Sequence, residues 1–193
     1  LPPHRVTVSD PDLGFYVYEL EQGLAPGDSL DMGFTLVAES RGFRNRRQDD
    51  RLVGNGTFVA NKNVFPVLGY VKASELQSGG QRRKHGLPPH QRTAKIDDDT
   101  ALQHNYLHAD WTSYETVIST SADQIALAPG HLEKEWVKEG RRYFHYKTQA
   151  PVIDLAVFIS ARFEVRRDSW NDVEIQIFYH PGHDYNINRM IEA

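Results

Sequence analysis

Hydrophobic and polar residues alternate along much of this chain, most clearly between residues 153 and 165. Apolar side chains hold every second position from Ile153 onward, and the intervening positions begin with Asp154. Because successive side chains of a β-strand point to opposite faces of a sheet, this pattern predicts one long strand with one buried face. Residues 173–179 alternate too, and the polar stretch 167–172 predicts a hairpin with a long loop between the two strands.

Further strands are predicted in both halves of the chain. Residues 15–20 and 30–36 read as a strand pair, and the segment 25–28, which contains Pro and Gly, reads as the turn between them. Three more segments are rich in β-branched or aromatic residues, or lie beside a Gly or Pro turn, and predict the strands 111–120, 124–127 and 141–147.

Helical signal is thin. Residues 133–138 fit a strand or a turn of helix, and residues 97–104 fit a short capped helix. The polar and charged stretches 39–56 and 72–96 are typical of long loops. We therefore expect an all-β domain with little helix, saddle-shaped or sandwich-like, in which large antiparallel sheets pack one apolar face inward.

The sequence shows no internal repeat, so we expect a single β domain over residues 1–193, excised from a larger protein. Residues 188–193 read like the first turns of a helix. We expect the segment 185–193 to begin the linker or helix that leads into the next domain of the longer chain.

Composition and charge exclude several classes of chemistry. The 193 residues include no cysteine, which excludes disulfides, Cys-ligated metals and thiol nucleophiles. The formal net charge of −4 gives no support to nucleic-acid binding, which usually requires a strongly basic domain. The apolar stretches are far shorter than the about 20 residues of a membrane helix, so we expect no direct membrane insertion of this segment.

Two histidine pairs are candidate metal ligands. His104 and His108 have the spacing of an H-E-x-x-H zinc helix, but Asn105 replaces the glutamate that acts as general base, so solvent-facing histidines are the favoured interpretation. His180 and His183 flank a Pro-Gly turn and are weak candidates to bind a metal with Asp184 as third ligand. The alternative is that the turn is structural and the histidines cap or line it.

No other catalytic motif is present in the sequence. The serines do not lie in a G-x-S-x-G elbow, and the Ser78-Gly-Gly80 stretch is expected in a loop and not between a strand and a helix, as a phosphate loop requires. The carboxylates of residues 97–99 lack the pattern of a calcium loop. We therefore assign no catalytic residue and no cofactor to this chain.

Three stretches in the second half carry a resemblance to a known family. They are Ile118-Ser-Thr-Ser-Ala-Asp-Gln-Ile-Ala-Leu-Ala-Pro-Gly130, Gly140-Arg-Arg-Tyr-Phe-His-Tyr146, and the strand that follows Pro151 and ends in Ser160-Ala-Arg-Phe-Glu164. They resemble the N-terminal domain of the family M1 zinc aminopeptidases, in which a proline-glycine turn precedes an aromatic strand and then a proline-led strand. The resemblance covers most of residues 25–190 and is most specific in the second half.

Other phrases resemble one bacterial subgroup in particular. In that subgroup an M1-like peptidase follows an ABC-transporter-like, multi-span membrane region. The phrases are Asn55-Gly-Thr-Phe58, Asp110-Trp111 and Tyr179-His-Pro-Gly-His-Asp-Tyr-Asn186. The resemblance implies a soluble domain of a membrane-anchored bacterial protein, on a side of the membrane that the sequence does not specify.

The resemblance also implies a function. The family's G-x-M-E-N and H-E-x-x-H-x18-E motifs are absent here, since family members carry them C-terminal to this domain. This chain would then be a non-catalytic domain that packs on the downstream peptidase domain, walls the substrate cleft and contacts the free N-terminus of a peptide. Zinc is expected in that catalytic domain and not here. Asn55 and Asn61 are the nearest matches to the family's substrate-binding residue.

Two alternatives remain open. In the first, the chain is a β-sandwich module that binds carbohydrate or protein through exposed aromatic residues. Its candidate platform is Trp111, Trp136 and Trp170, although partial burial in the core is the more common state of a tryptophan. In the second, the chain belongs to a degenerate peptidase relative and serves only as a scaffold.

Overall fold

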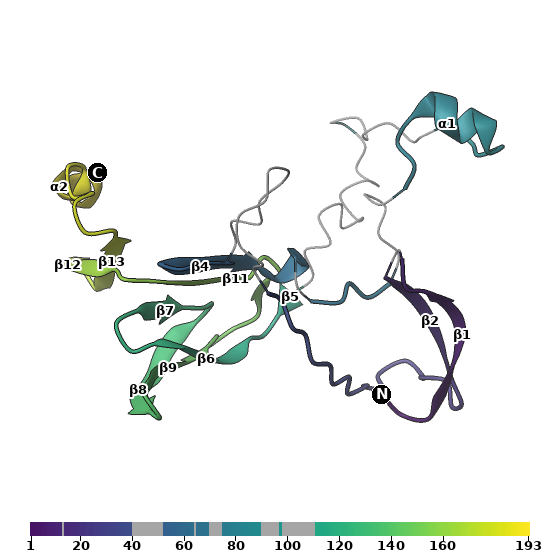
Figure 1. Cartoon of the computed structure of the whole chain (residues 1–193), viewed down its shortest axis with the longest axis horizontal. Helices are drawn as coiled ribbons and strands as arrows, with labels where there is room; N and C mark the ends of the chain where they lie inside the picture. The colour runs from purple at the N-terminus through teal and green to yellow at the C-terminus, as the bar shows by residue number, and fades with distance from the viewer. Residues whose placement is uncertain (13, 40–51, 64, 70–74, 90–96, 98–110) are drawn as a thin grey trace. The chain divides into compact units, whose positions relative to one another are not determined.

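A computed structural model describes residues 1–12, 14–39, 52–63, 65–69, 75–89, 97 and 111–193 (Figure 1). The chain divides into two compact units, residues 1–38 and 39–193, which are treated separately below. The described residues are mostly β, in several antiparallel sheets, with two short α-helices. The expected all-β class with little helix is confirmed at this level. The saddle or sandwich arrangement and the single domain stay predictions.

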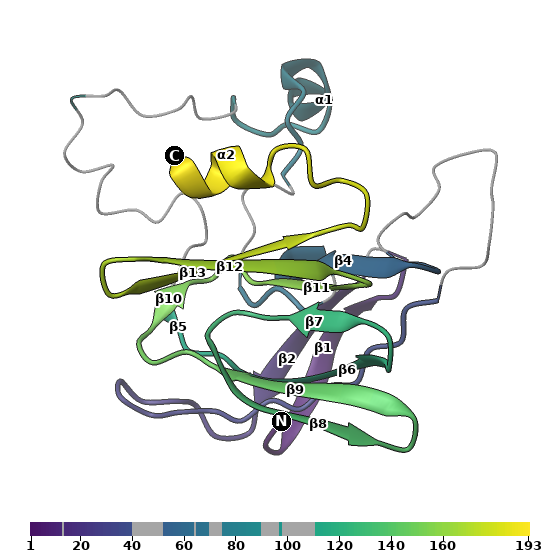
Figure 2. The same cartoon turned by 90° about the vertical axis from the view of Figure 1, so that its left-hand side faces the viewer.

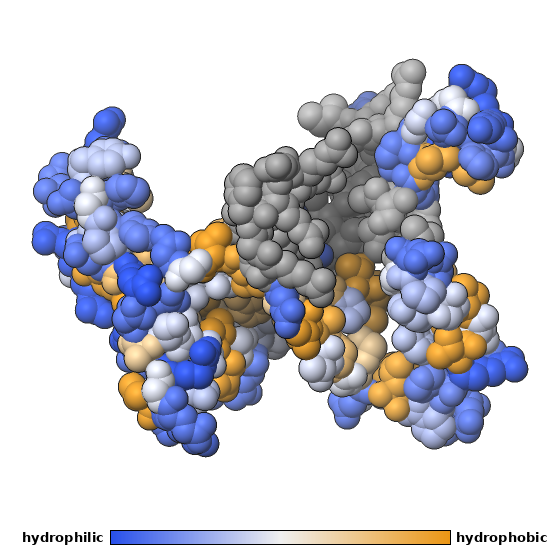
Figure 3. Space-filling view, in the orientation of Figure 1, coloured by the Kyte–Doolittle hydropathy of each residue, from blue (hydrophilic) through white to orange (hydrophobic). Residues whose placement is uncertain are grey.

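The first unit is a two-stranded ribbon of β1 (His4–Asp10) and β2 (Phe15–Leu20), with a bulge between Val6 and Val8. Valine and aromatic side chains of both strands are exposed. Figure 3 shows hydrophobic residues at the surface of this unit on the side that faces the viewer. A two-stranded ribbon that buries so little apolar surface has little stability of its own.

The prediction that β2 pairs with residues 30–36 is wrong. β1 takes the backbone hydrogen bonds of β2, and residues 30–36 form no ladder. The predicted turn is present, because the Asp28 N–H donates to the Ala25 carbonyl at 3.0 Å and the Ala25 N–H donates to Asp28 Oδ2 at 2.8 Å. The turn at residues 25–28 was therefore predicted correctly, while the strand that pairs with β2 was not.

The second unit contains a four-stranded sheet in the order β3-β4-β11-β7. Its strands are β3 (Leu52–Val53), β4 (Gly56–Ala60), β11 (Val157–Ala161) and β7 (Ile125–Leu127). All pairings are antiparallel, and β11 lies between two strands that are far from it in the sequence. β3 and the start of β4 fall in a stretch that was expected to be a loop, so that prediction is wrong for residues 52–53 and 56.

A three-stranded sheet has the order β6-β9-β8, with β6 (Glu115–Ser121), β9 (Arg141–Lys147) and β8 (His131–Lys138). β8 and β9 join through Glu139 and Gly140, whose φ angles of 51° and 73° are both positive, as a type I′ hairpin turn requires. The ambiguous segment 133–138 is thus a strand.

Two further strand pairs complete the described β structure of this unit. They are β5 (Trp111–Thr112) with β10 (Val152–Ile153), and β12 (Glu164–Trp170) with β13 (Val173–Tyr179) (Figure 2). β12 continues to Trp170 and turns within two residues, so the expected long loop at 167–172 is wrong. Asn171, at φ 51°, adopts the left-handed backbone conformation that this tight turn needs.

The apolar core lies where β7 packs against the three-stranded sheet. Ala126 of β7 and Phe144 and Tyr146 of β9 are buried together. The Tyr146 hydroxyl donates a hydrogen bond to the Ala126 carbonyl at 2.9 Å, so the one polar group of this cluster is satisfied between the two sheets. Desolvation by burial raises the pKa of Tyr146, which keeps the hydroxyl protonated as a donor.

Gly130 sets how closely the start of β8 approaches the end of β9. Its φ is +102°, and a Cβ at this position would lie 2.3 Å from the Lys147 carbonyl carbon. Neither the backbone angle nor the space admits another residue. Glycine at the Pro129-Gly130 turn is therefore required sterically, in addition to being favoured by the turn.

The long strand predicted for residues 153–165 is not continuous, so this prediction is wrong. It is broken into β10, β11 and β12, with a tight turn in which the Leu155 N–H donates to the Ile153 carbonyl at 2.7 Å. Burial does not follow the predicted faces: Leu155 is 60% exposed and Ala161 of the same face is buried, while Ala156 and Ser160 of the opposite face are buried too. The alternation is present, but side-chain hydrogen bonds at Asp154, described below, stabilise the turn.

Short helices account for the rest of the described regular structure: η1 (Asn61–Asn63), α1 (Gly79–Lys84) and α2 (Ile187–Glu192). α2 confirms the helix expected near residue 188. Its role as a link to another domain stays a prediction.

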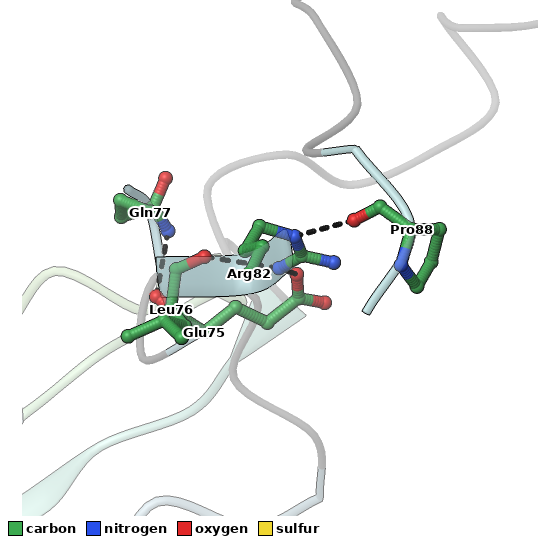
Figure 4. A network of polar contacts seen from close by, with 5 residues as sticks. All are labelled: Glu75, Leu76, Gln77, Arg82 and Pro88. Atoms are coloured by element: carbon green, nitrogen blue, oxygen red, sulfur yellow. Dashed lines mark hydrogen bonds and ion pairs between the residues drawn. The ribbon is translucent and has the colours of Figure 1, made fainter. Parts of the chain in front are cut away.

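α1 corrects the expected loop at 72–96, because Ser78 is its N-cap and the hydroxyl accepts from the Gln81 N–H. Buried Arg82 stabilises this segment by donating to the carboxylate of Glu75 at 2.9 Å and to the carbonyls of Leu76 and Pro88 at 3.0 and 2.7 Å (Figure 4). The Arg82–Glu75 ion pair is local to residues 75–88 and explains why a six-residue helix forms here.

Candidate functional site

Asn55 and His180 come together although they lie 125 residues apart in the sequence. Asn55 lies in the turn between β3 and β4, and His180 follows β13 directly. The Asn55 Nδ2 and His180 Nε2 atoms are 3.4 Å apart, at an exposed position. The predicted substrate-binding residue and a predicted metal ligand thus belong to one place on the second unit.

A pocket of about 200 Å³ lies beside this pair. It is lined mainly by apolar groups of β3, β4 and β11, among them Val53, Phe58 and Ile159. Its polar members are Asn55, Thr57, Ser160 and His180. A small apolar hollow with a few convergent polar groups is typical of a site that orients a ligand. We call Asn55, His180 and this pocket the Asn55–His180 site.

The turn after β13 adds further titratable groups near this site. The His183 N–H donates to the His180 carbonyl at 2.9 Å, and the two imidazole centroids are 6.0 Å apart. Tyr179 is hydrogen-bonded to Glu164, and this bond raises the pKa of the Tyr179 hydroxyl.

In the part of the chain that the structure describes, no three His, Asp or Glu side chains are grouped as a metal would require. The proposed third ligand, Asp184, therefore does not complete a set with His180 and His183. The alternative, a structural turn flanked by two histidines, explains the Pro181-Gly182 sequence. Gly182 has a positive φ of 83°, which a turn of this kind favours.

Asn61 lies in a different environment, at the end of β4, where it is only 7% exposed. Its Nδ2 donates to Asp154 Oδ1 at 2.5 Å and to the Tyr114 hydroxyl at 3.3 Å, and its Oδ1 accepts from the Lys62 N–H at 2.7 Å. The Tyr114 hydroxyl donates to the same Asp154 oxygen. We call Asn61, Tyr114 and Asp154 the Asn61 cluster.

The Asn61 cluster connects three segments of the second unit. Asn61 begins η1, Tyr114 lies between β5 and β6, and Asp154 lies in the turn between β10 and β11. Desolvation by burial, followed by the hydrogen bond to Asp154 and its charge, raises the pKa of Tyr114 to about 12. A tyrosine with this pKa stays protonated and acts as a hydrogen-bond donor, so the cluster is suited to holding backbone segments together and not to base catalysis.

Tyr114 and Asp154 were not predicted as functional or structural partners of Asn61. Asp154 was assigned to the polar face of a continuous strand, and a polar residue in an alternating pattern carries no signal of burial. Tyr114 lies within the strand predicted for residues 111–120 and belongs to no motif; the structure divides that strand into β5 and β6, with Tyr114 in the break between them.

The remaining candidates divide into three cases. His104 and His108, with Asn105, lie outside the described residues. Trp111 and Trp170 are 74% and 69% exposed, so the common expectation of burial is wrong for both. Trp136 is partly buried and stacks on Tyr143, with ring centroids 5.2 Å apart.

Comparison with known proteins gives no relative: no family model, no curated protein and no solved structure matches this chain. The described helices are all too short or too polar to cross a membrane. Membership of the M1 aminopeptidase family is therefore a proposal.

Proposed function

We propose that this chain is the non-catalytic N-terminal domain of a membrane-associated, zinc-dependent M1-like aminopeptidase. It packs on the peptidase domain and forms one wall of the substrate cleft. Zinc belongs to that downstream domain, where it would polarise the scissile carbonyl and activate water. The role of this chain is to contact the free N-terminal end of the peptide.

The Asn55–His180 site is the observation that carries the proposal. A cleft wall needs polar groups for the peptide terminus and an apolar hollow for a side chain, and this site offers both on an exposed surface. Neither Asn55 nor His180 belongs to a group of metal-ligating side chains among the described residues. These features support a role in binding.

Kinetics of the complete membrane protein test this proposal. With an aminoacyl p-nitroanilide as substrate, Asn55→Ala and His180→Ala are expected to raise KM several-fold and leave kcat nearly unchanged, because they remove binding common to ground and transition states. Asn188→Ala and His131→Ala, at exposed positions outside the site, are the matched controls. Unchanged KM in both site variants would contradict the proposal.

Activity of the 193-residue chain alone is a second test. We expect the purified chain, supplied with zinc, not to hydrolyse the same anilide. Turnover that is abolished by a chelator would show that the chain holds its own catalytic site.

A carbohydrate- or protein-binding module is the second candidate, favoured by the exposure of Trp111 and Trp170. Flat, exposed indoles can stack on sugar rings or anchor a protein partner. Binding to a glycan array that is lost in Trp111→Ala or Trp170→Ala, with kinetics of the complete protein unchanged, would favour this function. A scaffold role in a degenerate peptidase predicts neither activity nor a KM effect.

A further inference from the structure

A second pocket, of about 290 Å³, lies between strand β6 and the β3, β4 and β11 strands of the four-stranded sheet. β6 is at one end of its sheet, so its outer edge is available to the pocket. The polar lining consists of one guanidinium, one carboxamide and several hydroxyl groups, and includes no Asp or Glu. These groups come from Arg141, Gln124, Thr57, Thr120, Ser119, Ser121 and Ser160.

Arg141 is held in place at this pocket. It lies on β9 and donates from Nε to Ser119 Oγ at 3.1 Å and from Nη2 to the Ser119 carbonyl at 2.7 Å, so its side chain extends across β6. No carboxylate of the described residues forms an ion pair with it, whereas neighbouring Arg142 pairs with Glu135 at 2.6 Å. Arg141 is therefore an oriented cation whose remaining N–H groups have no partner in the described part of the chain.

Two buried polar side chains also line the pocket. Gln124 and Ser160 are 6% and 7% exposed. The Gln124 Oε1 accepts from the Thr120 hydroxyl at 2.7 Å, which leaves its amide N–H groups without a partner among the described residues, and the Ser160 hydroxyl has none there either. Leaving buried donors unpaired is costly, so native proteins usually supply a partner such as water or a ligand.

We propose that this pocket binds an oxyanion, the carboxylate or phosphate group of a small polar molecule. Its free groups are N–H donors of Arg141 and Gln124 together with hydroxyls, and no negative side chain opposes an anion. A guanidinium forms two parallel hydrogen bonds to a carboxylate or phosphate, which a pre-oriented Arg141 can offer without further ordering. The volume suits a small ligand and is below the usual range for larger ones.

This inference is independent of the aminopeptidase proposal. The two pockets share lining residues of β3, β4 and β11, but Arg141 and Gln124 line only the oxyanion pocket, and Asn55 and His180 line only the other. Loss of one site therefore leaves the other testable, because oxyanion binding is measured on the 193-residue chain and the KM effect is measured on the complete protein.

The experiment is a titration of the ¹⁵N-labelled chain, followed by NMR, with sodium acetate in one arm and sodium phosphate in the other. Sodium chloride at matched ionic strength is the reference. We expect saturable shifts of the Ser119, Gln124 and Ser160 amides with at least one oxyanion, and the arm that saturates at lower concentration identifies the preferred group. Shifts with neither oxyanion beyond those with chloride would overturn the proposal.

Variants connect the binding to Arg141. Arg141→Met is expected to weaken binding by about tenfold or more, as loss of a charge-assisted bond does. Arg167→Met, at an exposed position on β12, is the matched control and should bind like the native chain. Should Arg141→Met fail to fold, Arg141→Lys keeps the charge but not the two-pronged geometry and should still bind more weakly. Native affinity in a folded Arg141 variant would refute the assignment.

Discussion

Asn55 and Asn61 stand at the two ends of β4 and were predicted for the same role, yet their surroundings are opposite. Asn55 is exposed and has one contact, at 3.4 Å, with His180. Asn61 is buried and bonds at 2.5 Å to Asp154, as well as to Tyr114 and to the backbone of Lys62. The same side chain thus holds the fold together at one end of the strand and is free to bind a ligand at the other.

The difference is one between a buried amide and an exposed amide. A buried amide must have its hydrogen bonds satisfied by the protein, because no water replaces a lost partner. An exposed amide exchanges between protein, water and ligand at little cost. The Asn61 cluster should therefore respond to mutation through stability, and the Asn55–His180 site through binding.

The largest expected effect is at Asn61. Asn61→Ala removes donors to Asp154 and Tyr114 and leaves the Asp154 carboxylate with fewer partners in a partly buried place. We expect the free energy of unfolding to fall by about 2 to 3 kcal/mol. Urea denaturation followed by circular dichroism measures it, and Asn55→Ala, expected within about 0.5 kcal/mol of the native chain, is the control. Equal losses in the two variants would remove the distinction.

Tyr114→Phe should have the next largest effect. It removes the hydroxyl that joins Asp154 and Asn61 while keeping the ring, so we expect a loss of about 1 to 2 kcal/mol at neutral pH. Thermal unfolding of the native and variant chains at one pH gives the difference. A variant as stable as the native chain would show that the hydroxyl bonds contribute no net stability.

The same tyrosine predicts a pH dependence. The pKa of Tyr114 rises from its ordinary 10.0 to about 12 in the folded chain. Between these values the unfolded chain releases this proton and the folded chain keeps it, so stability is fully present below pH 10 and declines as the pH rises through 12. Tyr146 and Tyr179 have raised pKa values too, so Tyr114→Phe should weaken this alkaline decline and not abolish it. An identical decline in the variant would contradict the assignment.

Local sequence signals predicted much of the β structure but not its interruptions. The strands at 141–147 and 173–179 were predicted correctly, because alternation and the Glu139-Gly140 turn act over a few residues. The break at Asp154 was missed because its causes lie far away: Tyr114 is 40 residues distant and Asn61 is 93. No window along the chain contains all three.

The candidate site, too, was predictable in its single residues but not in the long-range contacts that bring them together. Asn55 was proposed from a family resemblance and His180 from its Pro-Gly turn, and neither argument places one beside the other. Their approach depends on β4 pairing with β11 and on where β13 ends, which are long-range choices of partner. β4 itself was missed because its partner, and not its own five residues, supplies the stabilising ladder.

The smallest expected effect is the coupling between Asn55 and His180, and a double-mutant cycle measures it. Their contact is long and exposed, so removing both side chains should cost the sum of the single losses, with a coupling energy of no more than about 0.5 kcal/mol. The matching cycle of Asn61→Ala with Tyr114→Phe should give a coupling above about 1 kcal/mol, because both side chains bond to one Asp154 oxygen in a partly buried network. A strong coupling of Asn55 with His180 would make that pair structural as well, and the functional reading of the exposed end of β4 would then lose its support.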